Sequence, residues 1–145
     1  MKIASIITGA LLGLVFIAGG LMVLLNLAPA PPPFPEGSAA AHFMTAFATT
    51  GYLKFVKCFE VIGGCLVAIP KTRRAGLLVL GPIIINILAF HGFITQGEGL
   101  LSPVLLILIA LTLFLVWVER VEFCAFLCHP CRPKADATPD GPAHS

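Results

Sequence analysis

The sequence of 145 residues contains few charged side chains. Only 11% of its residues are Asp, Glu, Lys or Arg, whereas 58% are hydrophobic, and the mean hydropathy is +1.00. Soluble domains carry about 25% charged residues, so this composition excludes an ordinary soluble protein. It also excludes a disordered chain, which needs low hydrophobicity and high charge. The formal net charge of +2 is too small for a nucleic-acid-binding surface.

The sequence contains long runs of apolar residues. A membrane-spanning helix needs about 20 mainly apolar residues, and four runs qualify, at about residues 3–27, 51–69, 75–93 and 100–118. The first run exceeds the apolar region of a signal peptide, which is about 7–15 residues, so we expect it to remain as an uncleaved helix. The sequence therefore predicts an all-α fold in which residues 1–123 form a bundle of four transmembrane helices in a lipid bilayer.

The charges between the runs predict how the bundle is oriented. The connection at 70–74 holds three cations in five residues, whereas the other two connections hold Glu36 and Glu98 and no Lys or Arg. Cytoplasmic loops are enriched in Lys and Arg, so we expect residues 70–74 and both termini to be cytoplasmic. The expected location is the plasma (inner) membrane of a bacterium.

Residues 28–50 form the first outer connection. Its prolines, from Pro29 to Pro35, predict a stiff exit from the first helix. Ser38 is suited to cap a short helix after them, and Phe43, Met44 and Phe47 would share one face of that helix. The pattern predicts an interfacial helix on the outer leaflet, with a plain linker as the alternative.

Three charged residues interrupt the second apolar run. At about 100° per residue, Lys54 and Glu60 lie about 60° to either side of Lys57. Charges inside a membrane face the bundle interior or a water-filled cleft. At about 1.5 Å per residue, Lys57, Glu60 and Asn86 of the third run reach similar depths of about 9–13 Å. The sequence thus predicts a polar pocket in the outer half of the bundle.

Two uses of this cluster remain open. Lys57 and Glu60 can form an ion pair, capped by Asn86, that only fixes helix packing. In the functional alternative the pocket holds a quinone: Lys57 and Asn86 donate to a carbonyl, and Glu60 carries the proton. A second version uses Lys54 and Lys57 to hold a small sulfur oxyanion. His91 lies about 140° around the helix from Asn86 and is a further candidate for substrate binding.

The C-terminal segment 124–145 follows the last run and is expected to be a cytoplasmic, disordered tail. Three of the five cysteines, Cys124, Cys128 and Cys131, lie in it. Together with His129 they are weak candidates for a zinc site, and unmodified thiols are the default interpretation. The chain has no flavin, nicotinamide or haem motif, so no intrinsic cofactor is expected.

The second and third runs resemble the DoxX family of small four-helix membrane proteins. The resemblance rests on the strings Gly51-Tyr52-Leu53, Val56-Lys57, Glu60-Val61-Ile62-Gly63-Gly64, Gly81-Pro82-Ile83-Ile84-Ile85-Asn86-Ile87 and Phe90-His91. It covers about residues 1–120 and carries over Lys57, Glu60, Asn86 and His91 as motif positions. It implies a redox-associated protein linked to thiosulfate:quinone oxidation or quinol oxidation.

Three roles are compatible with that resemblance. The chain can itself be a quinone-linked oxidoreductase subunit, with Glu60 and Lys57 as catalytic residues. It can instead be a non-catalytic accessory subunit of a respiratory or membrane redox complex. The expected partner in the membrane is a subunit of such a complex or, in a homo-oligomer, a second copy of the chain. A transporter is disfavoured, because the inner half of the bundle is apolar and only four spans are present.

Overall fold

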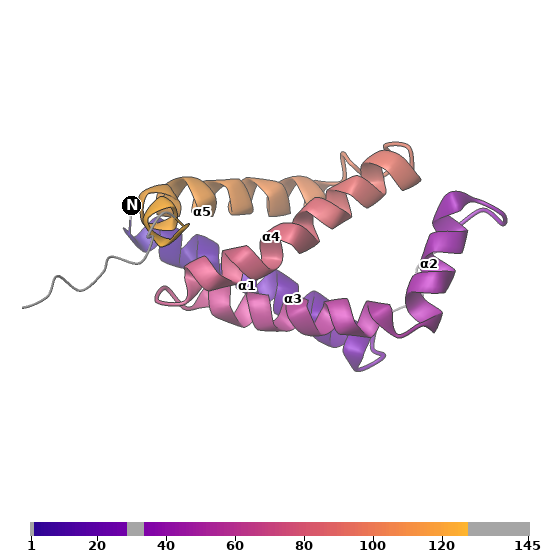
Figure 1. The fold of residues 1–145 in the computed structure, drawn as a ribbon, viewed down its shortest axis with the longest axis horizontal. Coiled ribbons are helices and arrows are strands. Elements are labelled where there is room, and N and C mark those ends of the chain that lie inside the picture. Colours follow the sequence, from indigo (N-terminus) through magenta and orange to yellow (C-terminus); the bar gives the residue numbers. More distant parts are fainter. Residues whose placement is uncertain (1, 29–33, 128–145) are drawn as a thin grey trace, which may run out of the picture.

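The structure is a computed structural model that describes residues 2–28 and 34–127, with side chains placed for 3–28 and 34–120. This part of the chain is helical and contains no strand, which confirms the all-α class. The elements, in order, are α1 (Lys2–Leu24), α2 (Ala39–Thr49), α3 (Tyr52–Ala68), α4 (Arg73–Ala89), the π-helical turn η1 (Phe90–Ile94) and α5 (Pro103–Leu127). Figure 1 shows α1, α3, α4 and α5 along the long axis and α2 across one end. We call that end the α2 end, and the opposite end, with the 69–72 turn, the hairpin end.

Three of the described helical segments are long and apolar enough to cross a membrane. They are Ile3–Leu24, Arg73–Ile94 and Pro103–Arg120. The second predicted span, 51–69, corresponds to α3, which has 17 residues, contains Lys54, Lys57 and Glu60, and is not among the three. The structure therefore supports a helical membrane protein, and the fourth span stays a prediction.

Glycines bring α1 and α3 into close contact. A Cβ atom added at Gly13 would lie 2.5 Å from the carbonyl oxygen of Gly64, and one at Gly64 would lie 2.9 Å from that of Gly13. A Cβ at Gly20 would similarly lie 2.6 Å from Cγ2 of Val61. Small residues let membrane helices approach closely enough for backbone-to-backbone packing. The core beside this contact is formed by the buried residues Leu12, Phe16, Val67, Leu77, Leu80, Ile84, Leu108 and Leu115.

The helices α3 and α4 separate toward the α2 end. Near the hairpin, Gly76 lets α4 pack closely against α3, because a Cβ atom added at Gly76 would lie 2.5 Å from the backbone nitrogen of Val67. Farther along, α4 contains Pro82. Proline lacks the N–H that would donate to the carbonyl four residues earlier, and it therefore bends helices. Beyond it, the helix moves away from α3 toward the start of α5 (Figure 1). The divergence leaves room for side chains of α2.

Helix α2 forms as predicted, but its apolar face has a different neighbour. The backbone N–H of Ala41 donates to Oγ of Ser38 at 3.2 Å, which confirms Ser38 as the N-cap. Phe43 and Phe47 contact Phe90 and Tyr52, with ring centroids 5.3 and 5.1 Å apart. The face that was expected to lie on the outer leaflet is therefore turned toward the rest of the chain, because aromatic partners lie on α3 and η1. Most of the proline segment, residues 29–33, lies outside the described residues.

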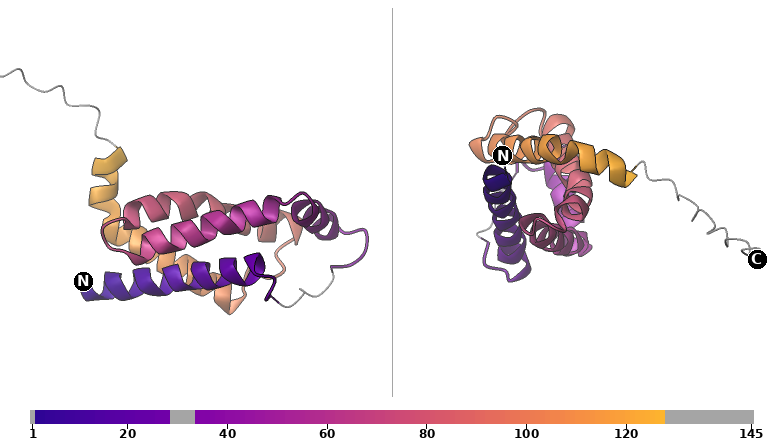
Figure 2. Two further views of the ribbon diagram at one scale, coloured as in Figure 1. Left: turned by 90° about the horizontal axis from the view of Figure 1, so that it is seen from below. Right: turned by 90° about the vertical axis from the view of Figure 1, so that its left-hand side faces the viewer.

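The last helix is longer than predicted. α5 begins at Pro103 and ends at Leu127, whereas the apolar run ends near 118. The first four residues of the expected tail, 124–127, are thus helical, and Figure 2 shows the end of α5 leaving the bundle at the hairpin end. Residues 128–145, including Cys128, His129 and Cys131, lie outside the described residues, so the disorder expected there stays a prediction.

Candidate functional site

The ion pair between Lys57 and Glu60 is the polar centre of the site. Nζ of Lys57 donates to both carboxylate oxygens of Glu60, each at 2.8 Å. The Glu60 side chain is only 6% exposed, and that of Lys57 is 21% exposed. The two residues lie one turn apart on α3, which allows this contact within a single helix. A carboxylate buried this deeply requires a cation or several donors, and Lys57 provides the cation.

A cavity of about 210 Å³ lies beside this pair. We call it the polar cavity. Its walls come from four elements: Phe43, Met44 and Phe47 of α2; Leu53, Val56, Lys57 and Glu60 of α3; Ile83, Asn86 and Ile87 of α4; and Phe90 and His91 of η1. The structure thus brings together four of the five predicted site residues. Lys54 is exposed and does not line the cavity.

His91 joins the cavity in spite of its predicted position on another helix face. The regular spacing of about 100° per residue separates it from Asn86 by about 140°. His91 is the second residue of the π-helical turn η1, and the cavity extends far enough around the helix for Asn86 and His91 both to line it. Nδ1 of His91 lies 3.0 Å from the carbonyl oxygen of Glu98. Because a carbonyl only accepts, Nδ1 is the donor in this contact.

Asn86 has unused hydrogen-bonding capacity in the part of the chain that the structure describes. Its side chain is exposed and makes no hydrogen bond there, including none to the Lys57–Glu60 pair. The expected capping of the pair by Asn86 is therefore not observed. The amide lines the polar cavity together with two adjoining ones of about 400 and 260 Å³. It can donate and accept at the junction of all three.

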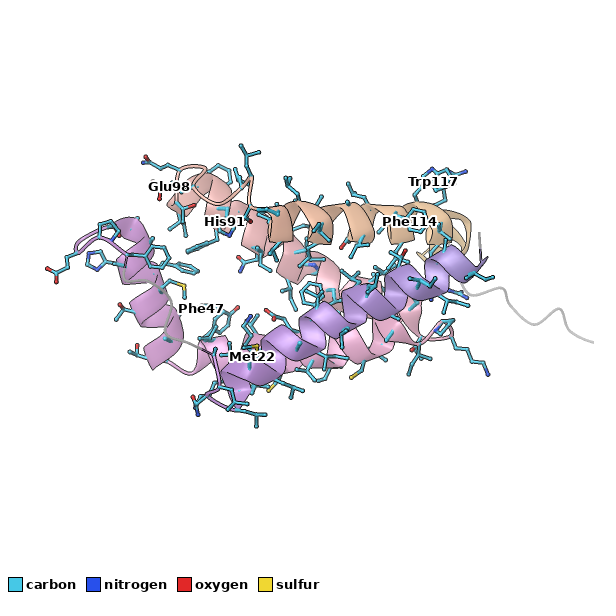
Figure 3. All side chains as sticks on the ribbon, turned by 180° about the vertical axis from the view of Figure 1, so that it is seen from behind. Met22, Phe47, His91, Glu98, Phe114 and Trp117 are labelled. Atoms are coloured by element: carbon cyan, nitrogen blue, oxygen red, sulfur yellow. The ribbon has the colours of Figure 1, made fainter. Side chains whose placement is uncertain are left out.

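A continuous series of aromatic rings borders these cavities. Phe43 contacts Phe47, Phe47 contacts Tyr52, and the series continues to Phe55 and Phe59, with centroid separations of 4.9 to 6.0 Å. Phe43 also contacts Phe90, whose ring lies 5.5 Å from that of His91. Figure 3 shows Phe47 and His91 at the α2 end, far from Trp117. Sequence reasoning missed this series, although Phe55 and Phe59 are spaced by four residues, as neighbours on one helix face are.

A second buried ionic contact lies at the hairpin end. Arg73 is 2% exposed, and its Nη1 atom lies 3.1 Å from Oε1 of Glu119. Its Nε atom donates to the carbonyl oxygen of Val67 at 3.4 Å. Gly9 of α1 leaves space for the guanidinium, because a Cβ there would lie 2.9 Å from Nε. From the sequence, Arg73 was expected to be a cation of the 70–74 connection. The acidic residue Glu119, next to the end of the last apolar run, could have indicated that a buried cation pairs with it.

The candidate zinc ligands remain without structural support. Cys124 lies in α5 with its side chain undescribed, and Cys128, His129 and Cys131 lie beyond the described residues. In the part of the chain that is described, no group of three His, Cys, Asp or Glu side chains is placed to hold a metal ion.

Comparison with known proteins gives a relative of unknown activity. The chain is 28% identical over 112 residues to a protein of Bacillus subtilis (strain 168) described as uncharacterized protein YwoB. That alignment covers 74% of this chain and 71% of the relative. No family model matches the chain. No solved structure matches it either.

Proposed function

We propose that the chain is a DoxX-like membrane protein that binds a quinone in the polar cavity and takes part in a quinone-linked redox reaction. The observation that carries the proposal is that Lys57, Glu60, Asn86 and His91 line one cavity. Binding sites for small organic molecules are typically apolar cavities with a few convergent polar groups, and the aromatic and aliphatic walls of this cavity fit that description.

Three of these four polar residues have a part in the proposed reaction. The Asn86 amide and the Lys57 ammonium donate hydrogen bonds to quinone carbonyl oxygens. Reduction of a quinone to a quinol adds two electrons and two protons, and Glu60 is the proton carrier. The two electrons come from a redox partner or from a second substrate that is oxidised as the quinone is reduced.

A small sulfur oxyanion is the second candidate ligand and has less support. Its binding would rely on Lys54 and Lys57 together, but Lys54 does not line the polar cavity. Glu60 already neutralises Lys57, and its carboxylate would repel an anion. A neutral quinone avoids both costs.

We also propose that α3 crosses the membrane with the other three long helices. Its 17 residues extend about 25 Å, close to the hydrocarbon thickness of about 30 Å. Close packing of α3 against α1 and α4 supports this placement. The cationic hairpin end would then face the cytoplasm of a bacterial cell and the α2 end the outside. Labelling of cysteines introduced at Glu36 and Lys71, from each side of the membrane, tests the orientation.

Retention of quinone by the purified protein tests the function. The full chain and its variants are purified in lipid nanodiscs, and bound quinone is extracted and quantified. We expect quinone in the wild type and its loss in Lys57→Met and Glu60→Gln, both checked for folding by circular dichroism. Lys71→Met, which removes an exposed cation at the hairpin end, is the matched control and should retain quinone.

The same experiment separates the two candidate ligands. Lys54→Met should retain quinone if the polar cavity is a quinone site, and should weaken binding of thiosulfate if that anion is the ligand. Absence of quinone from every sample, wild type included, would refute the proposed function for the isolated chain.

An accessory role is the second candidate function, and α5 favours it. The apolar side chains of Val104, Ile107 and Leu113 are 69%, 57% and 62% exposed. This face suits lipid, a partner helix of a redox complex or a second copy of the chain. Isolation in a mild detergent of a stoichiometric partner, with no bound quinone, would support this function over the first.

A further inference from the structure

The polar cavity adjoins a second cavity between α3 and α4, which no charged residue lines. This cavity, which we call the lateral slot, has a volume of about 260 Å³. It shares Val56, Ile83 and Asn86 with the polar cavity. The residues that belong to the slot and not to the polar cavity are Tyr52, Phe55, Phe59, Val79 and Pro82. The two cavities therefore meet along one wall, with Asn86 at the junction.

The lateral slot differs from the polar cavity in chemistry and in exposure. None of its lining residues carries a charge, whereas Lys57 and Glu60 line the polar cavity. The rings of Phe55 and Phe59 are 58% and 40% exposed, so the slot reaches the outer face of the helix pair. Ile62, which follows Phe59 by three residues on α3, is also an exposed apolar residue. In a bilayer this face of α3 and α4 meets lipid tails.

We propose that the ligand of this site is an amphiphile whose apolar chain lies in the lateral slot while its carbonyl-bearing ring occupies the polar cavity. The inference rests on the proposed function and specifies its substrate class: a quinone with an isoprenoid tail, which enters sideways from the bilayer. A small water-soluble oxyanion would contact the polar end alone. Pro82 and Val79 of α4 and Phe59 of α3 contact the isoprenoid tail and select for it. Asn86 binds at the point where the ring of the ligand joins its tail.

The test compares two ligands that share a ring. One is a tailless 1,4-naphthoquinone, and the other is the same ring with a two-isoprene tail. Affinity is measured for the full chain in nanodiscs, after subtraction of the signal from empty nanodiscs. Val79→Trp fills the slot, because Val79 lines the slot and not the polar cavity. The matched control is Leu78→Trp, which adds the same ring at the neighbouring exposed position of α4, outside both cavities.

The tail partitions equally into the lipid of every sample. A difference in affinity between variants therefore measures the contribution of the lateral slot to binding. We expect Val79→Trp to weaken binding of the tailed ligand about tenfold, equal to about 1.4 kcal/mol. The tailless ligand should stay within about twofold of the wild type, and Leu78→Trp should change neither ligand by more than that factor.

Two results would overturn the inference in distinguishable ways. If Val79→Trp affects both ligands equally or neither, while Glu60→Gln still abolishes binding, the polar site stands and the role of the lateral slot is wrong. If the folded wild type binds neither ligand, the proposed function and the inference both fail.

Discussion

The Nη1 atom of Arg73 lies 3.1 Å from Oε1 of Glu119, and this contact joins the first residue of α4 to α5 across 46 positions of sequence. The Lys57–Glu60 pair, by contrast, spans three positions of one helix. The first pair fastens two helices at the hairpin end, and the second borders a cavity at the α2 end. Their different surroundings lead to different expectations for substitution.

Loss of Arg73 should destabilise the folded chain. Arg73→Met leaves the largely buried carboxylate of Glu119 without its closest partner, and breaking a buried ion pair costs about 3 kcal/mol or more. Arg74→Met is the control, because the Arg74 side chain is 37% exposed and its Nε atom lies 3.9 Å from Glu119. Its effect should stay below about 1 kcal/mol. Unfolding by SDS, followed by circular dichroism, measures both, and equal effects would contradict the assigned role of Arg73.

The Lys57–Glu60 pair should show energetic coupling. Lys57→Met leaves the buried Glu60 unpaired, whereas Glu60→Gln leaves a cation that is partly exposed, so Lys57→Met should be the more destabilising change. The double variant should recover part of the stability, with a coupling energy of about 0.5–3 kcal/mol. Unfolding free energies of the four proteins complete the cycle. Additive effects would mean that the two side chains do not interact in the folded protein.

Alanine at Gly13 should separate α1 from α3. The added Cβ would lie 2.5 Å from the carbonyl oxygen of Gly64, a backbone atom that cannot move alone. Overpacking of this kind costs about 1–3 kcal/mol. Gly19→Ala on the same helix is the matched control, because a Cβ there meets nothing within 4 Å. It should be neutral or slightly stabilising, since Ala favours helix over Gly by about 0.5–1 kcal/mol. The midpoint of thermal unfolding in detergent distinguishes them.

Alanine at Gly99 should displace the His91 ring. A Cβ at Gly99 would lie 2.9 Å from both Cε1 and Nδ1 of His91, so the hydrogen bond from Nδ1 to Glu98 would break. Diethyl pyrocarbonate should then modify His91 faster, as quantified at this residue by mass spectrometry.

Gly97→Ala provides the control for backbone strain. Gly97 has φ +95° and Gly99 has φ +84°, so both substitutions strain the backbone, but a Cβ at Gly97 meets nothing within 4 Å. Faster modification of His91 in Gly97→Ala as well would assign the effect to the loop conformation and not to contact with the ring.

Local pattern accounts for much of the fold. The apolar run at 3–27 predicts α1 to within three residues at its end, and Ser38 marks the start of α2 correctly. The spacing of Lys57 and Glu60 predicts their contact, because neighbours three apart on a helix lie side by side. These features depend on helix geometry alone, which repeats regularly along a chain.

The site needed more than regular geometry. The helical wheel separates His91 from Asn86, yet both line the polar cavity, because its walls come from four elements that surround this end of α4. Hydropathy does not indicate which way the apolar face of α2 turns, because lipid and aromatic side chains are both apolar neighbours. Its partners, Tyr52 and Phe90, are known only when α3 and η1 are placed.

The sequence by itself determined that this is a helical membrane protein with polar residues gathered on its second apolar run, because hydropathy and helical periodicity are properties of neighbouring residues. Only the tertiary structure decided that Lys57, Glu60, Asn86 and His91 border one cavity, that Lys54 does not, and that Arg73 is buried against Glu119. These relationships join helices that are distant in sequence. They depend on how closely glycines let the helices approach and on where α4 departs from α3, which is a result of packing the whole chain.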